Sequence, residues 1–172
     1  MDRIGIVAFA FGLPPRTITN KIIAYIASQN ADRCRAPIYT ETNIPVDVAK
    51  RISWHPGNFG EPVALLDLAM GAAEWAEKNS LDKLLVATAK PALGRAMRDL
   101  KHALNERGVS IKVEPCIEID FYYRGVWFSP ESVLARSRFP LVWWSREIIL
   151  RFLPMFLYKR VASYSNPVSR HF

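Results

Sequence analysis

The chain has 172 residues, of which 50% are hydrophobic and 23% are charged. This composition is typical of a globular domain and excludes an intrinsically disordered protein. The formal net charge is +7, yet no segment interleaves basic and aromatic residues densely enough to predict a nucleic-acid-binding surface. The excess of basic residues is instead expected to suit small anions or anionic lipid.

The compartment is predicted from the first residues and from the cysteines. Asp2 and Arg3 precede an apolar stretch that ends by Gly12, which is not the pattern of a signal peptide. Cys34 and Cys116 are far apart and have no CxxC spacing, so we expect reduced thiols rather than a disulfide or a metal site. A cytoplasmic protein is therefore expected.

The first segments of the chain alternate between strand and helix patterns. Residues 4–11 are continuously apolar, as in a central parallel strand. Residues 18–30 carry isoleucines at helical spacing, and either Thr17 or Thr19 can cap this helix. A second strand is expected at 37–42, residues 46–54 are ambiguous, and 55–60 form a loop rich in turn residues.

The alternation continues through the middle of the chain. A long and mostly apolar helix is expected from Glu61 to Asn79, packed inside the fold or across an oligomer interface. A buried strand at 84–87 and a helix that begins at Pro91 and stops at Gly108 follow it. Further strands are expected at 111–113 and 117–121. The alternation predicts a single α/β domain over residues 1–172, a three-layer Rossmann-like fold with a mostly parallel sheet and helices on both faces.

The C-terminal third adds an apolar helix from about Leu141 to Leu153. The stretch 139–158 has the length of a membrane span. Three charged residues in its middle each cost roughly 2.5–3.5 kcal/mol at the centre of a span, so no transmembrane helix is expected: Arg146, Glu147 and Arg151. Residues 139–160 are predicted to pack on the sheet or on a partner subunit, and attachment to a membrane surface is the further alternative.

The stretch 83–98 carries the strongest indication of a binding site. Arg95 and Arg98 lie in the first turns of a predicted helix, away from its apolar stripe. The helix dipole disfavours a cation there by about 0.3–1 kcal/mol. Two arginines beside the free N–H groups of a helix start therefore predict an anion site.

Loops that follow three predicted strands are expected to converge on this site. The carboxyl ends of parallel strands share one edge of the sheet, where open α/β sheets bind ligands. The first loop has a single glycine, so it is neither a GxGxxG motif nor a P-loop, and an ordinary loop with a capping threonine is the alternative interpretation. The predicted ligand-binding residues are Arg16, Thr17, Asn58, Thr88, Lys90 and Arg95.

Catalytic and metal-binding residues are less well marked. His55 and Glu61 are the candidates for a general base, and neither belongs to a recognisable triad. A continuous strand would place three carboxylates on one face, where they could hold a divalent cation: Glu114, Glu118 and Asp120. Pro115 interrupts that run, and a solvated strand face explains it as well. No metal site is predicted, and no cofactor is indicated.

Two stretches resemble the YdcF/SanA-like family of bacterial α/β proteins. LLVATAKPALGRAM is similar to that family's strand ending in threonine and its following Arg-Ala pair, with Thr88, Arg95 and Ala96 at the matching positions. WWSREIILRFLPMFLYKRV resembles the family's tail, with Arg146 and Glu147 at its arginine–glutamate pair.

The resemblance implies a Rossmann-like fold with a pocket at the carboxyl ends of the strands. Asn58 and Glu61 echo a polar segment of the family, but its histidine between the threonine and the arginine is absent, as is its two-glycine turn. A shared catalytic mechanism is therefore not expected, whereas an anion pocket around Arg95 is. Some members of the family are anchored in membranes.

Two functions follow from these patterns. The first is a cytoplasmic protein that binds a small anionic ligand, nucleotide-like or phosphorylated; if it is an enzyme, a transferase or hydrolase for such a substrate is expected. The second is a non-catalytic protein that acts through its aromatic C-terminal helix, residues 139–160, in homo-oligomerisation or in association with a membrane surface.

Overall fold

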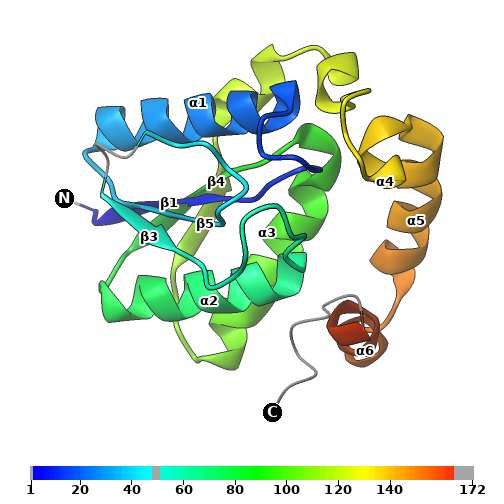
Figure 1. Cartoon of the computed structure of the whole chain (residues 1–172). Coiled ribbons are helices and arrows are strands. Elements are labelled where there is room, and N and C mark those ends of the chain that lie inside the picture. The colour runs from blue at the N-terminus through cyan, green and yellow to red at the C-terminus, as the bar shows by residue number, and fades with distance from the viewer. Residues whose placement is uncertain (1, 48–50, 165–172) are drawn as a thin grey trace.

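The structure, a computed structural model, describes residues 2–47 and 51–164. Its centre is one sheet of five parallel strands in the order β3-β2-β1-β4-β5, with helices on both faces (Figure 1). The strands are β1 (Ile4–Ala8), β2 (Ile38–Thr40), β3 (Ile52–Trp54), β4 (Lys83–Ala87) and β5 (Lys112–Pro115). The prediction of a three-layer, Rossmann-like α/β fold is confirmed.

Three long helices cover the sheet. Helix α1 (Ile18–Cys34) lies on one face, and α2 (Leu65–Lys78) and α3 (Lys90–Glu106) lie on the other (Figure 1). β1 and β4 pair along their whole length in the middle of the sheet. Residues on both of their faces are buried, such as Ile6 and Val7 of β1. This double burial explains why these strands are uniformly apolar.

The observed helix boundaries differ from the predicted ones at two places. Thr17 caps α1 as predicted, but the helix continues past Asn30 to Cys34 and ends where Arg35 adopts a left-handed conformation. Helix α2 begins at Leu65 rather than at Glu61. Asn43 holds residues 60–61, which precede α2, in a non-helical conformation, because its amide donates to Glu61 O and its carbonyl accepts from Gly60 N.

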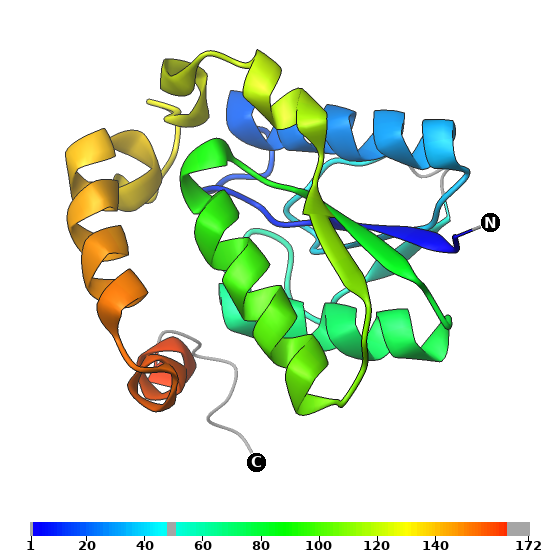
Figure 2. The ribbon, with the colours of Figure 1, turned by 180° about the vertical axis from the view of Figure 1, so that it is seen from behind.

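The strand predicted at 117–121 is wrong. β5 ends at Pro115, and residues Ile117–Phe121 form the 3₁₀ helix η1, followed by η2 (Arg124–Trp127). β5 is an edge strand, and its ladder with β4 closes with a hydrogen bond from Cys116 N to Val86 O at 3.0 Å. The chain then turns into η1 and crosses to the α1 side of the sheet (Figure 2).

The three carboxylates near this turn consequently share no strand face. Each one pairs with a different cation: Glu114 with Lys112, Glu118 with Arg33, and Asp120 with Lys90. Among the residues that the structure describes, no group of three acidic, histidine or cysteine side chains is placed to hold a metal ion.

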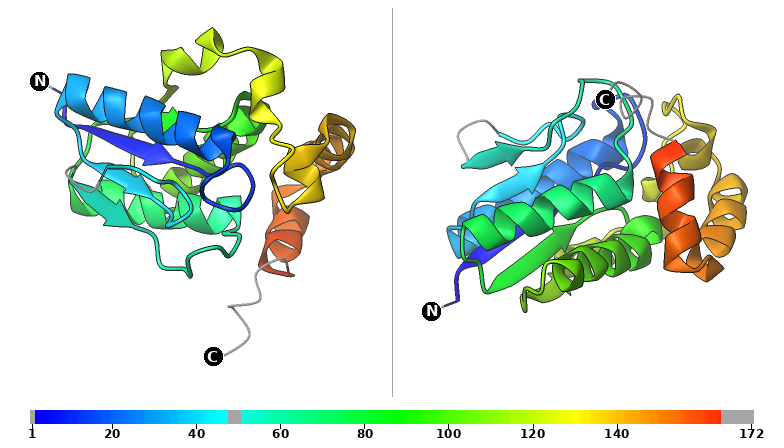
Figure 3. Two further views of the ribbon diagram at one scale, coloured as in Figure 1. Left: turned by 45° about the horizontal axis from the view of Figure 1, so that its top comes forward. Right: turned by 90° about the horizontal axis from the view of Figure 1, so that it is seen from below.

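The last described segment forms a C-terminal cap, which we define as residues 135–164. It contains α4 (Ala135–Arg138), α5 (Pro140–Phe152) and α6 (Met155–Tyr164). The segment predicted as one helix, 139–160, is thus two helices, with the break at Leu153 and Pro154. The cap stands across the carboxyl edge of the sheet (Figure 3). Within residues 2–47 and 51–164, no helix has the length and apolar character that a membrane crossing requires.

Candidate functional site

A cavity of about 110 Å³ lies between the carboxyl edge of the sheet and the cap. Its sheet side is formed by Ala10–Gly12, which follow β1, and by Ala92 in the first turn of α3, which follows β4. The chain leaves β1 toward β2 and β3, and then returns to add β4 and β5 on the other side. The cavity therefore occupies the topological switch point, where open α/β sheets bind ligands.

Two buried contacts set the shape of the loop after β1. Glu41, at the end of β2, accepts hydrogen bonds from Ala10 N at 2.9 Å and from the Asn43 amide at 3.0 Å. Gly12 has φ +97°, and a Cβ there would lie 2.5 Å from Ser137 Oγ of the cap. The first contact ties the loop to the segment after β2, and the second shows that the loop passes so close to the cap that position 12 has no room for a side chain.

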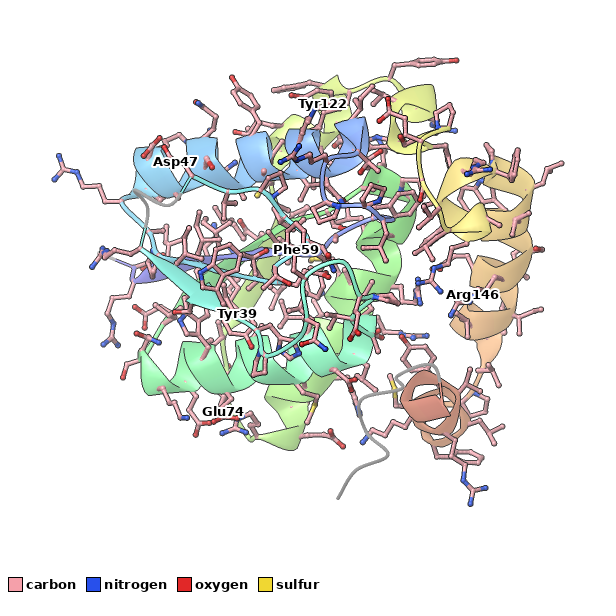
Figure 4. All side chains as sticks on the ribbon, in the orientation of Figure 1. Tyr39, Asp47, Phe59, Glu74, Tyr122 and Arg146 are labelled. Atoms are coloured by element: carbon pink, nitrogen blue, oxygen red, sulfur yellow. The ribbon has the colours of Figure 1, made fainter. Side chains whose placement is uncertain are left out.

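Three arginines from three helices line the cavity. Arg95 comes from α3, Arg136 from α4 and Arg146 from α5, and Arg146 projects into the space between α5 and the rest of the domain (Figure 4). One carboxylate accompanies them: Glu147, 2% exposed, whose Oε2 lies 3.1 Å from Arg95 Nε. Within the described part of the chain, neither Arg136 nor Arg146 has a carboxylate within 4 Å.

The pKa values of Arg136 and Arg146 are lowered, first by burial and then by neighbouring positive charge. Burial lowers the pKa of Arg136 to about 10, and repulsion from Arg146 and Arg95 contributes. Burial and repulsion from Arg95 also lower the pKa of Arg146. Each guanidinium remains protonated at neutral pH, so the cavity holds more positive than negative charge. An anion bound there would relieve this repulsion.

The starts of two helices add to the positive potential. The first turn of α2 lines the cavity through Ala64 and Leu65, and α3 does so through Ala92. Neither Ala64 nor Ala89, the residues that precede these helices, supplies a side-chain cap. In the first turn of α3, however, Pro91 has no N–H and Ala92 N already donates to Ala89 O at 2.9 Å. Uncapped backbone donors at this edge therefore come from the first turn of α2, while the positive ends of both dipoles lie beside the arginines.

A buried polar contact anchors the cap next to the cavity. Tyr158 of α6 donates a hydrogen bond to Asp99 Oδ2 at 2.6 Å, and Arg98 lies 2.9 Å from the other oxygen of that carboxylate. Burial, with the nearby Asp99 charge, raises the pKa of Tyr158 to about 12, so the phenol stays protonated and donates. Arg98 also donates to Leu150 O at 3.1 Å, which ties α3 to α5.

Of the six predicted ligand-binding residues, Arg95 is the one that lines this cavity. Thr88 is buried and donates to Phe9 O at 3.2 Å. Lys90 pairs with Asp120 at 2.6 Å. Thr17 is buried and accepts from Asn20 N as the cap of α1, and Arg16 borders a shallow hollow beside that helix.

The loop between β3 and α2 does not bring its polar side chains to the cavity. The His55 ring lies 2.8 Å from the Tyr39 hydroxyl, and burial lowers the pKa of His55. Asn58 donates to Glu61 Oε2 at 3.0 Å. The candidate general bases therefore contact neighbours in their own region, while the cavity is bordered by Pro62 and the residues that follow it.

The arginines that predicted an anion site also have partners within the protein. Arg95 pairs with Glu147, and Arg98 pairs with Asp99. Arg136 was not predicted as a site residue, because no motif surrounds it. The sequence signal that could have indicated it is local charge: residues 135–164 contain six basic side chains and a single acidic one.

Sequence comparisons add no relative to this description. No protein-family model matches the chain, and no curated protein is significantly similar to it in sequence.

Proposed function

We propose that the protein binds a small phosphorylated ligand whose phosphate occupies the cavity between the sheet and the cap. The observation that carries this proposal is the set of three arginines, Arg95, Arg136 and Arg146, with Glu147 as their one carboxylate neighbour among the described residues. Half-buried cations without counter-charges are unfavourable in the free protein. A dianion offers the two charges that the cavity lacks.

The shape of the site supports a phosphate group in particular. Guanidinium groups bind tetrahedral and planar oxyanions through paired hydrogen bonds. The first turn of α2 adds backbone donors, and about 110 Å³ leaves room for one oxyanion rather than a whole nucleotide. The remainder of the ligand would then lie at the mouth of the cavity.

The proposal concerns binding and not turnover. Among the described residues that line the cavity there is no histidine, cysteine or carboxylate to act as a general base near neutral pH. The resemblance to the YdcF/SanA-like family remains part of this proposal. Its matching positions Arg95, Arg146 and Glu147 meet at the cavity edge, which supports an anion pocket around Arg95.

Isothermal titration calorimetry with inorganic phosphate and with a phosphomonoester tests the proposal. We expect saturable binding to the natural protein. Arg146→Gln and Arg136→Gln should each raise the Kd at least about tenfold, because each removes charge-assisted hydrogen bonds worth about 1.5–3 kcal/mol.

Arg16→Gln is the matched control, since it removes one exposed arginine at the same edge of the sheet but away from the cavity. Its Kd should equal that of the natural protein. Equal weakening by all three substitutions would show that phosphate responds to net charge alone, and the site would be refuted.

A further inference from the structure

The outer face of the cap is an exposed apolar stripe. Leu141, Ile148 and Phe152 of α5 are 84%, 55% and 81% exposed, and Trp144 is 46% exposed. Their spacing of three or four residues places them on one side of the helix. Phe156 of α6, 68% exposed, extends the apolar surface beyond the break between the two helices.

Helix α5 therefore has two different faces. Trp143, Glu147 and Leu150 are buried toward the sheet, and Arg146 lines the cavity on the same side. The stripe residues alternate with them along the helix and point the opposite way. A helix of a single domain needs one apolar face to pack, so the second face has no role in holding the fold together.

The charge of the cap indicates what kind of partner can bind to that apolar face. Glu147 is the sole acidic residue in 135–164, and it is buried against Arg95. The outer surface of the cap thus contributes no carboxylate, while residues 135–164 carry six basic side chains and Arg138 is exposed with its guanidinium over the Phe139 ring. Two copies of this strongly basic segment would repel each other.

We infer that the outer face of α5 and α6 docks on an anionic lipid surface, with Leu141, Trp144 and Phe152 inserted at the level of the headgroups. An exposed apolar stripe on a strongly basic segment is the pattern of helices that lie in the membrane interface. Tryptophan is favoured at that depth because its ring is apolar and its N–H can donate. The inference goes beyond the proposed phosphate site and does not depend on it.

Co-sedimentation of the full chain with lipid vesicles tests the inference. We expect binding to vesicles of phosphatidylcholine mixed with phosphatidylserine, weaker binding to phosphatidylcholine alone, and weakening by salt. The double substitution Leu141→Glu/Phe152→Glu should reduce partitioning at least about tenfold, because it removes two inserted apolar groups and adds negative charge. Both side chains are exposed, so the fold should tolerate the change, which circular dichroism would verify.

Phe59→Glu is the matched control, because Phe59 is 73% exposed on a loop outside the cap; vesicle binding should be unchanged. Arg146→Gln should also sediment with vesicles, which separates this surface from the phosphate cavity. Vesicle binding that survives the double substitution would overturn the inference, as would absence of binding by the natural protein. A dimer in light scattering that the double substitution converts to a monomer would identify a second copy as the occupant instead.

Discussion

The layers around the sheet and the C-terminal cap use charged residues in opposite ways. On the sheet layers, exposed ionisable side chains form pairs, such as Arg107 with Glu77 at 2.7 Å and Lys78 with Glu74 at 2.6 Å. In the cap, Arg136 and Arg146 face the cavity, and neither has a carboxylate within 4 Å among the residues that the structure describes. Surface pairs contribute little either way, whereas unbalanced cations in a cavity oppose folding. A site that binds an anion needs such unpaired cations, even though they lower the stability of the free protein.

The largest effect is expected where the cap has its single carboxylate. Glu147→Gln removes the counter-charge of Arg95 and leaves three cations around the cavity. Breaking a buried ion pair costs about 3–5 kcal/mol of unfolding free energy, which urea denaturation would measure. Added phosphate should recover part of this loss. If the Glu147→Gln protein were as stable as the natural one, the claim that cations in the cap oppose folding would be contradicted.

The anchor between the cap and α3 comes next. Tyr158→Phe leaves the buried Asp99 carboxylate without the donor that now lies 2.6 Å away. An unsatisfied buried acceptor costs about 1–3 kcal/mol. Lys78→Ala on the sheet layers breaks an exposed pair and should leave the unfolding free energy nearly unchanged. Equal losses for the two substitutions, in the same denaturation experiment, would contradict this account of the anchor.

One substitution in the cap is expected to stabilise the free protein and, at the same time, to reduce its stabilisation by phosphate. Arg136→Met removes a half-buried cation that has no carboxylate partner in the described part of the chain. We expect the free protein to gain about 0.5 kcal/mol or more, and the stabilisation by phosphate to fall. Thermal unfolding with and without phosphate measures both quantities. A protein destabilised in both conditions would mean that Arg136 has a structural role.

The smallest effect concerns pH and the buried carboxylate at the end of β2. Burial raises the pKa of Glu41, although hydrogen bonds from Asn43 and Ala10 oppose the shift. The folded state then binds this proton more tightly than the unfolded state, so the contribution of Glu41 to stability rises as pH falls below neutral and is lost as pH rises. Urea denaturation at pH 7 and pH 5 would measure this effect. The unfolding free energy of the natural protein minus that of Glu41→Gln should be larger at pH 5 than at pH 7. An unchanged or reversed difference would show that the hydrogen bonds dominate.

The layered fold could be predicted from the sequence because each element has its own period. Ile4–Ala8 and Lys83–Ala87 are short apolar runs bounded by polar residues, and Pro91 and Gly108 mark the two ends of α3. The failure at 117–121 has a local cause. Alternating residues predicted a strand there, but pairing with β4 ends at Cys116, residues 117–121 form a 3₁₀ helix, and the three carboxylates pair with separate cations.

The site could be predicted less well, because its residues are far apart in sequence. Arg95 was indicated by its place near a helix start after β4. Arg136 and Arg146 reach the same cavity from helices that fold back over the sheet edge, and no spacing rule encodes that return. Thr88 and Thr17 resemble ligand-binding residues in position, yet each makes a hydrogen bond to the backbone of the fold.

Thermal unfolding in sodium phosphate and in sodium chloride at matched ionic strength tests the central claim most directly. A ligand at 100 times its Kd adds about 2.7 kcal/mol, which raises the Tm of a chain of this size by about 5–10 °C. We expect such a rise for the natural protein and its loss in Arg146→Gln. Equal Tm values in the two salts for the natural protein would contradict the claim that the cavity binds phosphate.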